Sequence, residues 1–194
     1  ISASVIKLIT NMREGIPAYI KFDMATQNTE LVKLSEGMKY TTSDHFNRNI
    51  YRHLRFNYPT YIFSDLSFEI DEDGVPYWIC PVKKYNIGLF GGTTIGRVVL
   101  CNAITGETKD YAVEDVPQWV DRVYSADLLV ELYNYHGTLK HGFFNSVLGQ
   151  KDCLNTTDGY NYLAIDDDVW VYTGVTSITG DQSNVGFVLM IQRT

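Results

Sequence analysis

Alternation of apolar and polar side chains between residues 66 and 108 predicts three consecutive antiparallel strands. Apolar positions 66, 68 and 70 alternate with polar ones, and this period of two indicates one buried and one exposed face. An acidic turn ending at Gly74 leads into an aromatic-rich strand over residues 77–83, and a third strand is expected over residues 97–102. The connection over residues 86–96 carries four glycines but no phosphate-binding motif, so we expect a hairpin loop.

Helical spacing of apolar residues marks three other stretches. The pattern predicts a helix over residues 2–14 and a second over residues 45–56, capped by Asp44, with Phe46, Ile50 and Leu54 on the face that packs on the strands. A third helical stretch begins near residue 116, breaks near Ser125 and resumes until Gly137.

Further strands are predicted over residues 19–24 and 29–34, as a hairpin, and over residues 160–165, 169–177 and 185–192. A helix followed by strands therefore occurs three times. We expect an α+β fold of tandem helix-plus-antiparallel-sheet units. The expected division is residues 1–40 as a partial unit, residues 41–113 as a helix plus meander, and residues 114–194 as a second helix-plus-sheet unit, truncated at its C-terminal end.

Composition indicates a soluble globular protein, because 45% of the 194 residues are hydrophobic and 20% are charged. The net charge of −7 argues against a general binder of nucleic acid or of anionic membranes. Three cysteines are too few for a disulfide scaffold, and their oxidation state stays open. No apolar run approaches the roughly 20 residues of a membrane span. The chain starts at Ile1 and stops on a strand pattern, which indicates a piece of a longer protein whose membrane anchor would lie outside it.

The acidic turn E-I-D-E-D-G at residues 69–74 and the strand ending N-A-I-T-G-E at residues 102–107 together resemble the PepSY module, with Asn102 where Asp is usual. The resemblance is good over residues 44–110 and looser over residues 116–194. The longer runs at residues 115–124 and 156–177 also resemble a group of large Gram-positive bacterial membrane-associated proteins. The resemblance implies an envelope-associated regulatory module on the extracytoplasmic side, with no catalytic residues and no cofactor.

Three groups of residues are candidates for a site. His45, Arg48, Arg52 and Arg55 fall on one face of the predicted helix. This face is expected to be a solvated stripe or to pair with Glu69, Asp71 and Asp73, and the alternative is a site for an anionic ligand or an acidic partner. Asp166, Asp167 and Asp168 form the densest acidic cluster, which in a turn would suit calcium. Cys153 with His136 or His141 offers a nucleophile and a base, although no local motif supports a cysteine hydrolase.

We therefore expect a chain that acts by binding rather than by catalysis, as a protein-interaction or regulatory domain of a bacterial envelope protein. Its expected partner is another protein or the cell wall, and not nucleic acid. The alternatives are a cysteine-dependent hydrolase and a binder of an anionic ligand.

Overall fold

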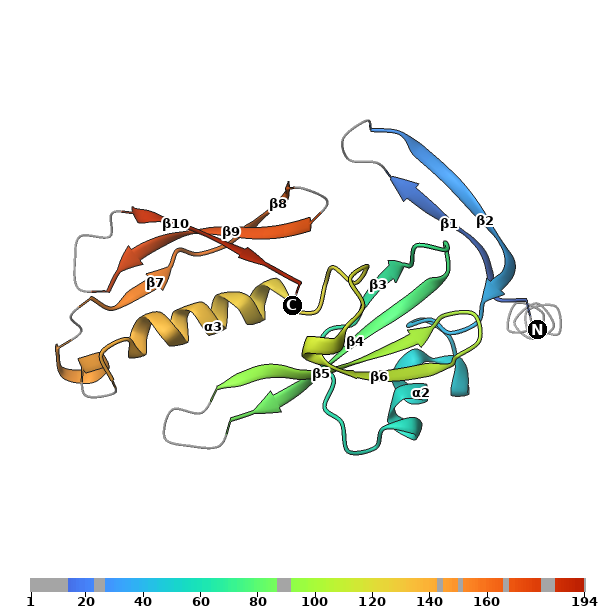
Figure 1. The fold of residues 1–194 in the computed structure, drawn as a ribbon, viewed down its shortest axis with the longest axis horizontal. Helices are drawn as coiled ribbons and strands as arrows, with labels where there is room; N and C mark the ends of the chain where they lie inside the picture. The colour runs from blue at the N-terminus through green and yellow to red at the C-terminus, as the bar shows by residue number, and fades with distance from the viewer. Residues whose placement is uncertain are drawn as a thin grey trace, which may run out of the picture. The chain divides into compact units, whose positions relative to one another are not determined.

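The computed structural model describes residues 14–22, 27–86, 92–142, 145–149, 152–165, 168–178 and 184–193. These residues form a mixture of helices and antiparallel strands, which confirms the expected α+β class (Figure 1). The chain divides into two compact units, which are described separately: unit 1 contains Ile1–Tyr61, Phe68–Trp78 and Leu100–Lys109, and unit 2 contains Ile62–Ser67, Ile79–Val99 and Asp110–Thr194. The predicted three-part division and its PepSY-like units stay predictions.

Unit 1 begins with a β-hairpin. Strand β1 (Ile16–Phe22) pairs antiparallel with β2 (Thr29–Met38), which confirms the predicted hairpin and extends both strands. The helix expected over residues 2–14 falls, except for its last residue, outside the described residues. At the base of the hairpin, the backbone N–H groups of Lys39 and Tyr40 both donate to the carbonyl oxygen of Ala103.

The predicted meander is present and has one more strand than expected. Its order is β3 (Ser67–Ile70), β4 (Pro76–Tyr85), β5 (Thr93–Asn102) and β6 (Thr108–Ala112). Four consecutive residues of β5 are buried, from Val98 to Cys101, so this strand has no exposed face in its second half. On β3, where alternation predicted a buried Phe68, its ring is 39% exposed and lies edge-on to Trp78.

The continuous helix expected over residues 45–56 is wrong, because Asn49 divides it. A short 3₁₀ turn, η1 (Phe46–Arg48), is followed by helix α2 (Ile50–Asn57), and the backbone of Asn49 between them is extended. The Asn49 side chain accepts from the Arg52 N–H and donates to the carbonyl oxygens of Thr42 and Asp44, so it caps α2 and ties down the preceding loop. Ile50 and Leu54 are buried as expected, whereas Phe46 is 66% exposed.

Unit 2 contains the third helical stretch, which begins later than the pattern indicated. Residues 116–125 form no helix, and α3 (Ala126–Leu139) starts at the N-cap Ser125, whose hydroxyl accepts from the Leu128 N–H. Val123 is nevertheless buried, and its N–H and that of Tyr124 donate to the carbonyl oxygen of Gln192. The short elements η2 (Val113–Asp115) and η3 (Asn145–Gly149) flank this region.

The last four strands form a second sheet. Strand β9 (Asp168–Ser177) pairs on one side with β10 (Asn184–Ile191) and on the other with β7 (Leu154–Thr156) and β8 (Asn161–Ile165), all antiparallel.

Helix α3 covers one face of this sheet (Figure 1). The Asn134 side chain donates to the Thr156 hydroxyl and accepts from the Thr156 N–H, at 3.0 and 2.7 Å. Gly137 does not end the helix. It lies so close to β7 that an added Cβ would be 2.5 Å from the Leu154 carbonyl oxygen.

Among the helices of the described residues, none has the length and apolarity needed to cross a membrane.

Candidate functional site

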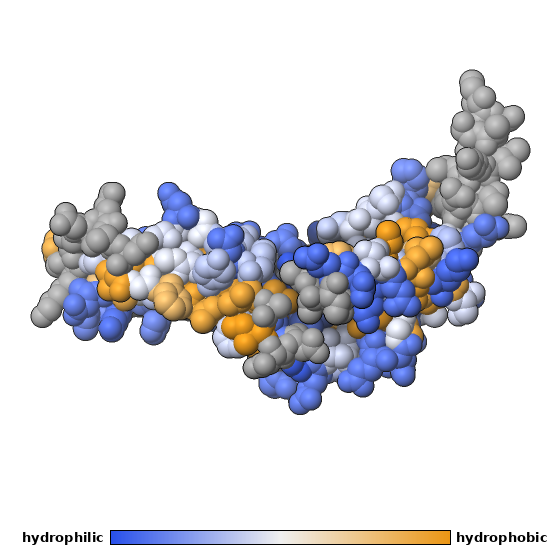
Figure 2. All heavy atoms as spheres, turned by 90° about the horizontal axis from the view of Figure 1, so that it is seen from above, coloured by the Kyte–Doolittle hydropathy of each residue, from blue (hydrophilic) through white to orange (hydrophobic). Residues whose placement is uncertain are grey.

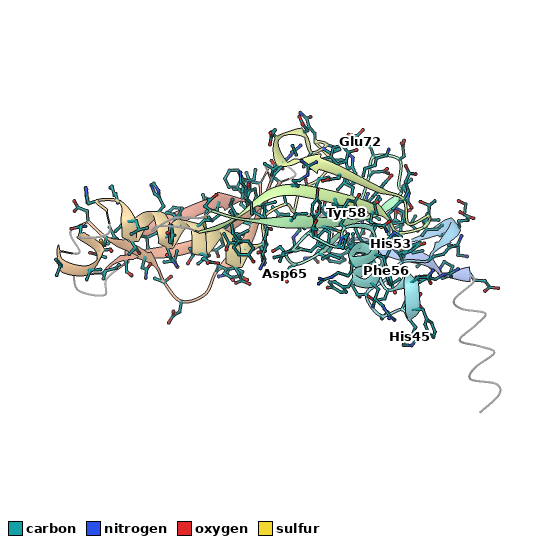
Figure 3. All side chains as sticks on the ribbon, turned by 90° about the horizontal axis from the view of Figure 1, so that it is seen from below. His45, His53, Phe56, Tyr58, Asp65 and Glu72 are labelled. Atoms are coloured by element: carbon teal, nitrogen blue, oxygen red, sulfur yellow. The ribbon has the colours of Figure 1, made fainter. Side chains whose placement is uncertain are left out.

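The basic residues expected on one helical face lie on two different elements. Arg48 belongs to η1, and Arg52 and Arg55 belong to α2, so the extended Asn49 interrupts their regular spacing. In Figure 3, His53 and Tyr58 lie beside the strands, and His45 lies at the far end of this segment. The His53 ring nitrogen Nε2 is 2.8 Å from the Gly106 carbonyl oxygen, and the Tyr58 hydroxyl donates to Thr108.

The three arginines form no ion pair with another residue that the structure describes. Arg52 and Arg55 are exposed, while the Nη1 atom of Arg48 is buried without a hydrogen-bond partner among the described residues. In the acidic turn that follows β3, the Asp71 carboxylate accepts from the N–H groups of Asp73 and Val75.

The acidic cluster lies at the connection between β8 and β9. Asp166 and Asp167 fall outside the described residues, so their part of the predicted calcium site is not placed. Asp168 begins β9, and its Oδ1 atom is 3.1 Å from Nη1 of Arg193, which forms an ion pair. Within the described part of the chain, no group of three or more His, Cys, Asp or Glu residues is arranged to hold a metal ion.

The candidate nucleophile Cys153 lies in the interior of unit 2. Its thiol is fully buried and donates to the Thr138 carbonyl oxygen, and the Asn145 side-chain amide donates to the sulfur. Of the candidate bases, His141 has its Nε2 atom 3.4 Å from the Asp152 carboxylate, and His136 is exposed near the end of α3. Cys101 is buried too, and this burial raises the pKa of its thiol to about 12. The cysteine-hydrolase hypothesis stays a prediction that this geometry does not favour.

A different surface is exposed and apolar: the face of the second sheet that α3 does not cover. Along β9, the side chains of Val171, Thr173 and Val175 are almost fully buried on the helix side, so alternate residues face the other way. This second face, here called the open face, is built from β8, β9 and β10. Its members include Leu163 of β8, Trp170, Tyr172 and Gly174 of β9, and Phe187, Leu189 and Ile191 of β10, and the polar Asn161 of β8 lies on the same face opposite Tyr172.

Register brings the open-face residues into direct cross-strand pairs. Leu189 lies opposite Tyr172, Ile191 and Leu163 both lie opposite Trp170, and Phe187 lies opposite Gly174. The large side chains on this face stay accessible: Phe187 is 74% exposed, Leu163 44%, Leu189 40% and Tyr172 38%. Figure 2 shows orange side chains gathered in a band over the part of the chain where Figure 1 draws β9 and β10.

A shallow hollow of about 500 Å³ lies in this surface. It is lined by Tyr172, Gly174, Gly186 and Phe187, so two aromatic rings flank two positions that have no side chain. An added Cβ on Gly186 would meet no atom within 4 Å. A hollow with this lining can accept an apolar side chain, and it provides neither a charged group nor a nucleophile.

Sequence reasoning missed the open face for a specific reason. The run V-G-F-V-L-M-I of residues 185–191 is continuously apolar, and such a run is typical of a strand buried on both faces. Gly174, opposite Phe187, and Gly186, beside it, could have indicated this surface from the sequence. Glycine inside a strand often marks a place where another group approaches closely.

No family model matches this chain, and neither a curated protein nor a solved structure matches it.

Proposed function

We propose that this chain is a binding module, and that its open face docks an apolar side chain of a protein partner into the hollow between Phe187 and Tyr172. The observation that carries the proposal is Phe187, a phenylalanine that is 74% exposed in the middle of a strand, with exposed Leu189 and Tyr172 beside it and exposed Leu163 further along the same face. Isolated exposed apolar residues are normal on protein surfaces, but contiguous ones mark interaction sites.

The size of the patch supports this assignment. An aromatic side chain has roughly 150–250 Å² of surface, so the exposed parts of Phe187 and Tyr172 alone amount to roughly 200 Å². With Leu163 and Leu189 the patch reaches a few hundred Å², which is the range in which the largest patch on a monomer is often functional. Aromatic residues beside an unfilled pocket are also the groups that dominate binding energy at protein interfaces.

The test compares two phenylalanines of nearly equal exposure, Phe187 at 74% and Phe56 of α2 at 75%. Wild-type protein, Phe187→Ser and Phe56→Ser are each immobilised and exposed to extracts of the native host, and captured proteins are identified by mass spectrometry. We expect the wild type and Phe56→Ser to retain the same partner and Phe187→Ser to lose it. Equal capture by Phe187→Ser would contradict the proposal, as would the absence of any protein specific to the folded chain.

We further propose that the module works in the bacterial envelope, on the extracytoplasmic side, as the resemblance to PepSY implies. A protease-protection assay of the native protein in intact host cells tests this compartment. Degradation by external protease after the wall is removed supports it, and full protection until the membrane is lysed contradicts it.

A second candidate function rests on the uncompensated arginines. We propose that Arg48, Arg52 and Arg55 bind an anionic ligand, because Arg48 has a buried Nη1 atom without a hydrogen-bond partner among the described residues. The test measures the melting temperature in inorganic phosphate and in pyrophosphate at constant ionic strength. Stabilisation that disappears when the three arginines are replaced by Gln supports the site. Stabilisation that survives in the triple variant, or none at all, argues against it.

A further inference from the structure

Charge is distributed unevenly along the chain, and the part that carries the open face is acidic. Residues 1–112 contain 12 acidic and 12 basic residues and are neutral as a group. Residues 113–194, which include α3 and the second sheet, contain 11 acidic and four basic residues and so carry the whole net charge of −7. Between Asp152 and Gln192, the stretch that supplies every strand of this sheet, there are six aspartates and neither lysine nor arginine. The strands of the open face therefore contain no cation that would repel a basic partner.

An ion pair lies at one end of the open face. Backbone hydrogen bonding between β9 and β10 continues past Ile191, which places Arg193 opposite Asp168. Because alternate residues of a strand share a face, Arg193 lies on the same face as Phe187, and its Nη1 atom is 3.1 Å from Oδ1 of Asp168. The guanidinium also donates to the Gln118 carbonyl oxygen. The charge of Arg193 is therefore already matched by a carboxylate of the sheet.

A second hollow, of about 620 Å³, adjoins this ion pair. Its lining consists of Glu114, Asp115, Val116, Gln118 and Arg193. Glu114 and Asp115 are exposed residues of η2, and neither forms an ion pair with another residue that the structure describes. Since Arg193 is paired with Asp168, this polar hollow has negative charge that no described side chain neutralises.

The apolar and polar hollows lie within reach of one extended segment. Phe187 lines the apolar hollow and Arg193 lines the polar one, and these two residues share a face six positions apart in the sequence. Six residues of a strand span about 20 Å. An extended peptide that lies along the open face and fills the apolar hollow with one side chain therefore places a second side chain, about six residues away, at the polar hollow.

We infer that the protein partner of the open face docks with a segment that is both apolar and basic. Its apolar side chain enters the hollow beside Phe187, and a lysine or arginine about six residues away lies against Glu114 and Asp115. The inference rests on the docking function proposed above and adds the chemistry of the partner. Complementary charge at an interface steers the encounter and suppresses wrong partners, so these carboxylates would select a basic segment.

The same charge argument disfavours other occupants. A second copy of this chain would bring another acidic half against the first, and like charges repel. An acidic peptide would meet the same repulsion. An exposed pair of opposite charges changes a binding constant by about fivefold at most, and salt screens it. The apolar contact therefore supplies most of the affinity, and the charges supply the preference for a basic segment.

Selection from a display library of random peptides tests the chemistry of the partner without knowledge of its identity. The peptides have about 12 residues, enough to span both hollows, and the whole wild-type chain is the bait, with Phe187→Ser as counter-selection. We expect the enriched peptides to carry an aromatic or aliphatic residue and, about six positions away, lysine or arginine. Peptides that depend on Phe187 but have no excess of basic residues would overturn the inference and leave the docking function intact. If no enriched peptide depends on Phe187, the docking function fails, and this inference fails with it.

Two matched charge reversals locate the cation of the best peptide. Glu114→Lys alters the polar hollow, whereas Glu131→Lys makes the same change at an exposed position of α3 outside that hollow. Fluorescence anisotropy of the labelled peptide measures binding. We expect Glu114→Lys to weaken binding about tenfold and Glu131→Lys to weaken it less than about twofold.

A charge-swapped peptide provides the converse measurement. When its basic residue is replaced by glutamate, the peptide should bind Glu114→Lys more tightly than it binds the wild type, because the new lysine then faces an opposite charge. Glu131→Lys should show no such gain. Equal effects of the two reversals on both peptides would overturn the inference, since the cation would then have no defined place beside Glu114 and Asp115.

Discussion

Phe187 of β10 lies directly opposite Gly174 of β9, so the most exposed of the described aromatic rings in the second sheet has no side chain across the strand to pack against. In an antiparallel sheet, cross-strand side-chain pairs supply much of the stabilisation. This pair has one member missing, and the hollow beside Phe187 is the result. The open face therefore lacks a side chain at position 174, and our proposed function is that an apolar side chain of a partner fills the hollow there.

Filling the hollow from within should stabilise the protein and weaken docking. We expect Gly174→Val to raise the free energy of unfolding by up to about 1 kcal/mol, because valine favours strands and gives Phe187 a neighbour. Urea denaturation measures this change, and the capture assay with Phe187→Ser as reference measures docking. A destabilised Gly174→Val protein would mean that the space above Gly174 is already occupied.

A methyl group at Gly137 should destabilise the packing of α3 on the second sheet. Alanine normally stabilises a helix by about 1 kcal/mol relative to glycine. Here its Cβ would lie 2.5 Å from the Leu154 carbonyl oxygen, a backbone atom that can move only with β7. We expect Gly137→Ala to lower the free energy of unfolding by about 1–3 kcal/mol in a denaturation experiment. An increase of about 1 kcal/mol would show instead that helix and strand are further apart.

Asn102 should be replaceable by aspartate but not by alanine. Its Oδ1 atom accepts from the N–H groups of Ile104 and Thr105, which closes the turn after β5. We expect Asn102→Ala to cost about 1–2 kcal/mol of unfolding free energy, because two backbone donors lose their acceptor. Asn102→Asp keeps that acceptor and should stay within about 0.5 kcal/mol of the wild type. Similar losses in both variants would show that the side-chain NH₂ group matters as well.

Cys101 should make the protein less stable in alkali. Its pKa is about 12 in the folded state, against 9.0 for an unperturbed thiol. Below pH 9 the thiol is neutral in both states, and between pH 9 and 12 only the unfolded chain loses the proton. The free energy of unfolding should therefore fall in this window by about 1.4 kcal/mol per pH unit from this group. Cys101→Ala serves as the control, and its stability should fall less steeply over the same window.

Cys153 should react with iodoacetamide only after unfolding, since its sulfur is fully buried. Mass spectrometry of labelled peptides, with and without urea, checks this outcome. Rapid labelling of Cys153 in the folded protein would show that its thiol is accessible and would support the cysteine-hydrolase hypothesis.

Local sequence determined the elements whose patterns are set by neighbouring residues. The hairpin, the three predicted strands of the meander and the strands over residues 160–192 follow from runs of strand-forming residues, which alternate in β3 and are continuously apolar in β10, and from turn residues such as Gly74. Ile50 and Leu54 lie one helical turn apart and are buried as the spacing indicated. Each of these features depends on backbone geometry over a few residues, which the amino-acid types themselves specify.

Specific hydrogen bonds and close backbone contacts decided the features that the spacing of apolar residues got wrong. The helix expected at residues 45–56 is divided because Asn49 bonds to Thr42 and Asp44, and residues 119–123 form no helix because their region is tied to Gln192. Gly137 looked like a helix stop and is a close approach to Leu154.

The sequence by itself determined an α+β chain with an apolar last strand, and the tertiary structure alone decided that this strand forms an edge with an open face. The physical reason is that a strand's hydrophobic pattern reports how much apolar surface it carries. Which neighbours cover that surface depends on how the strands pair, and pairing with β9 places Gly174, which has no side chain, opposite Phe187.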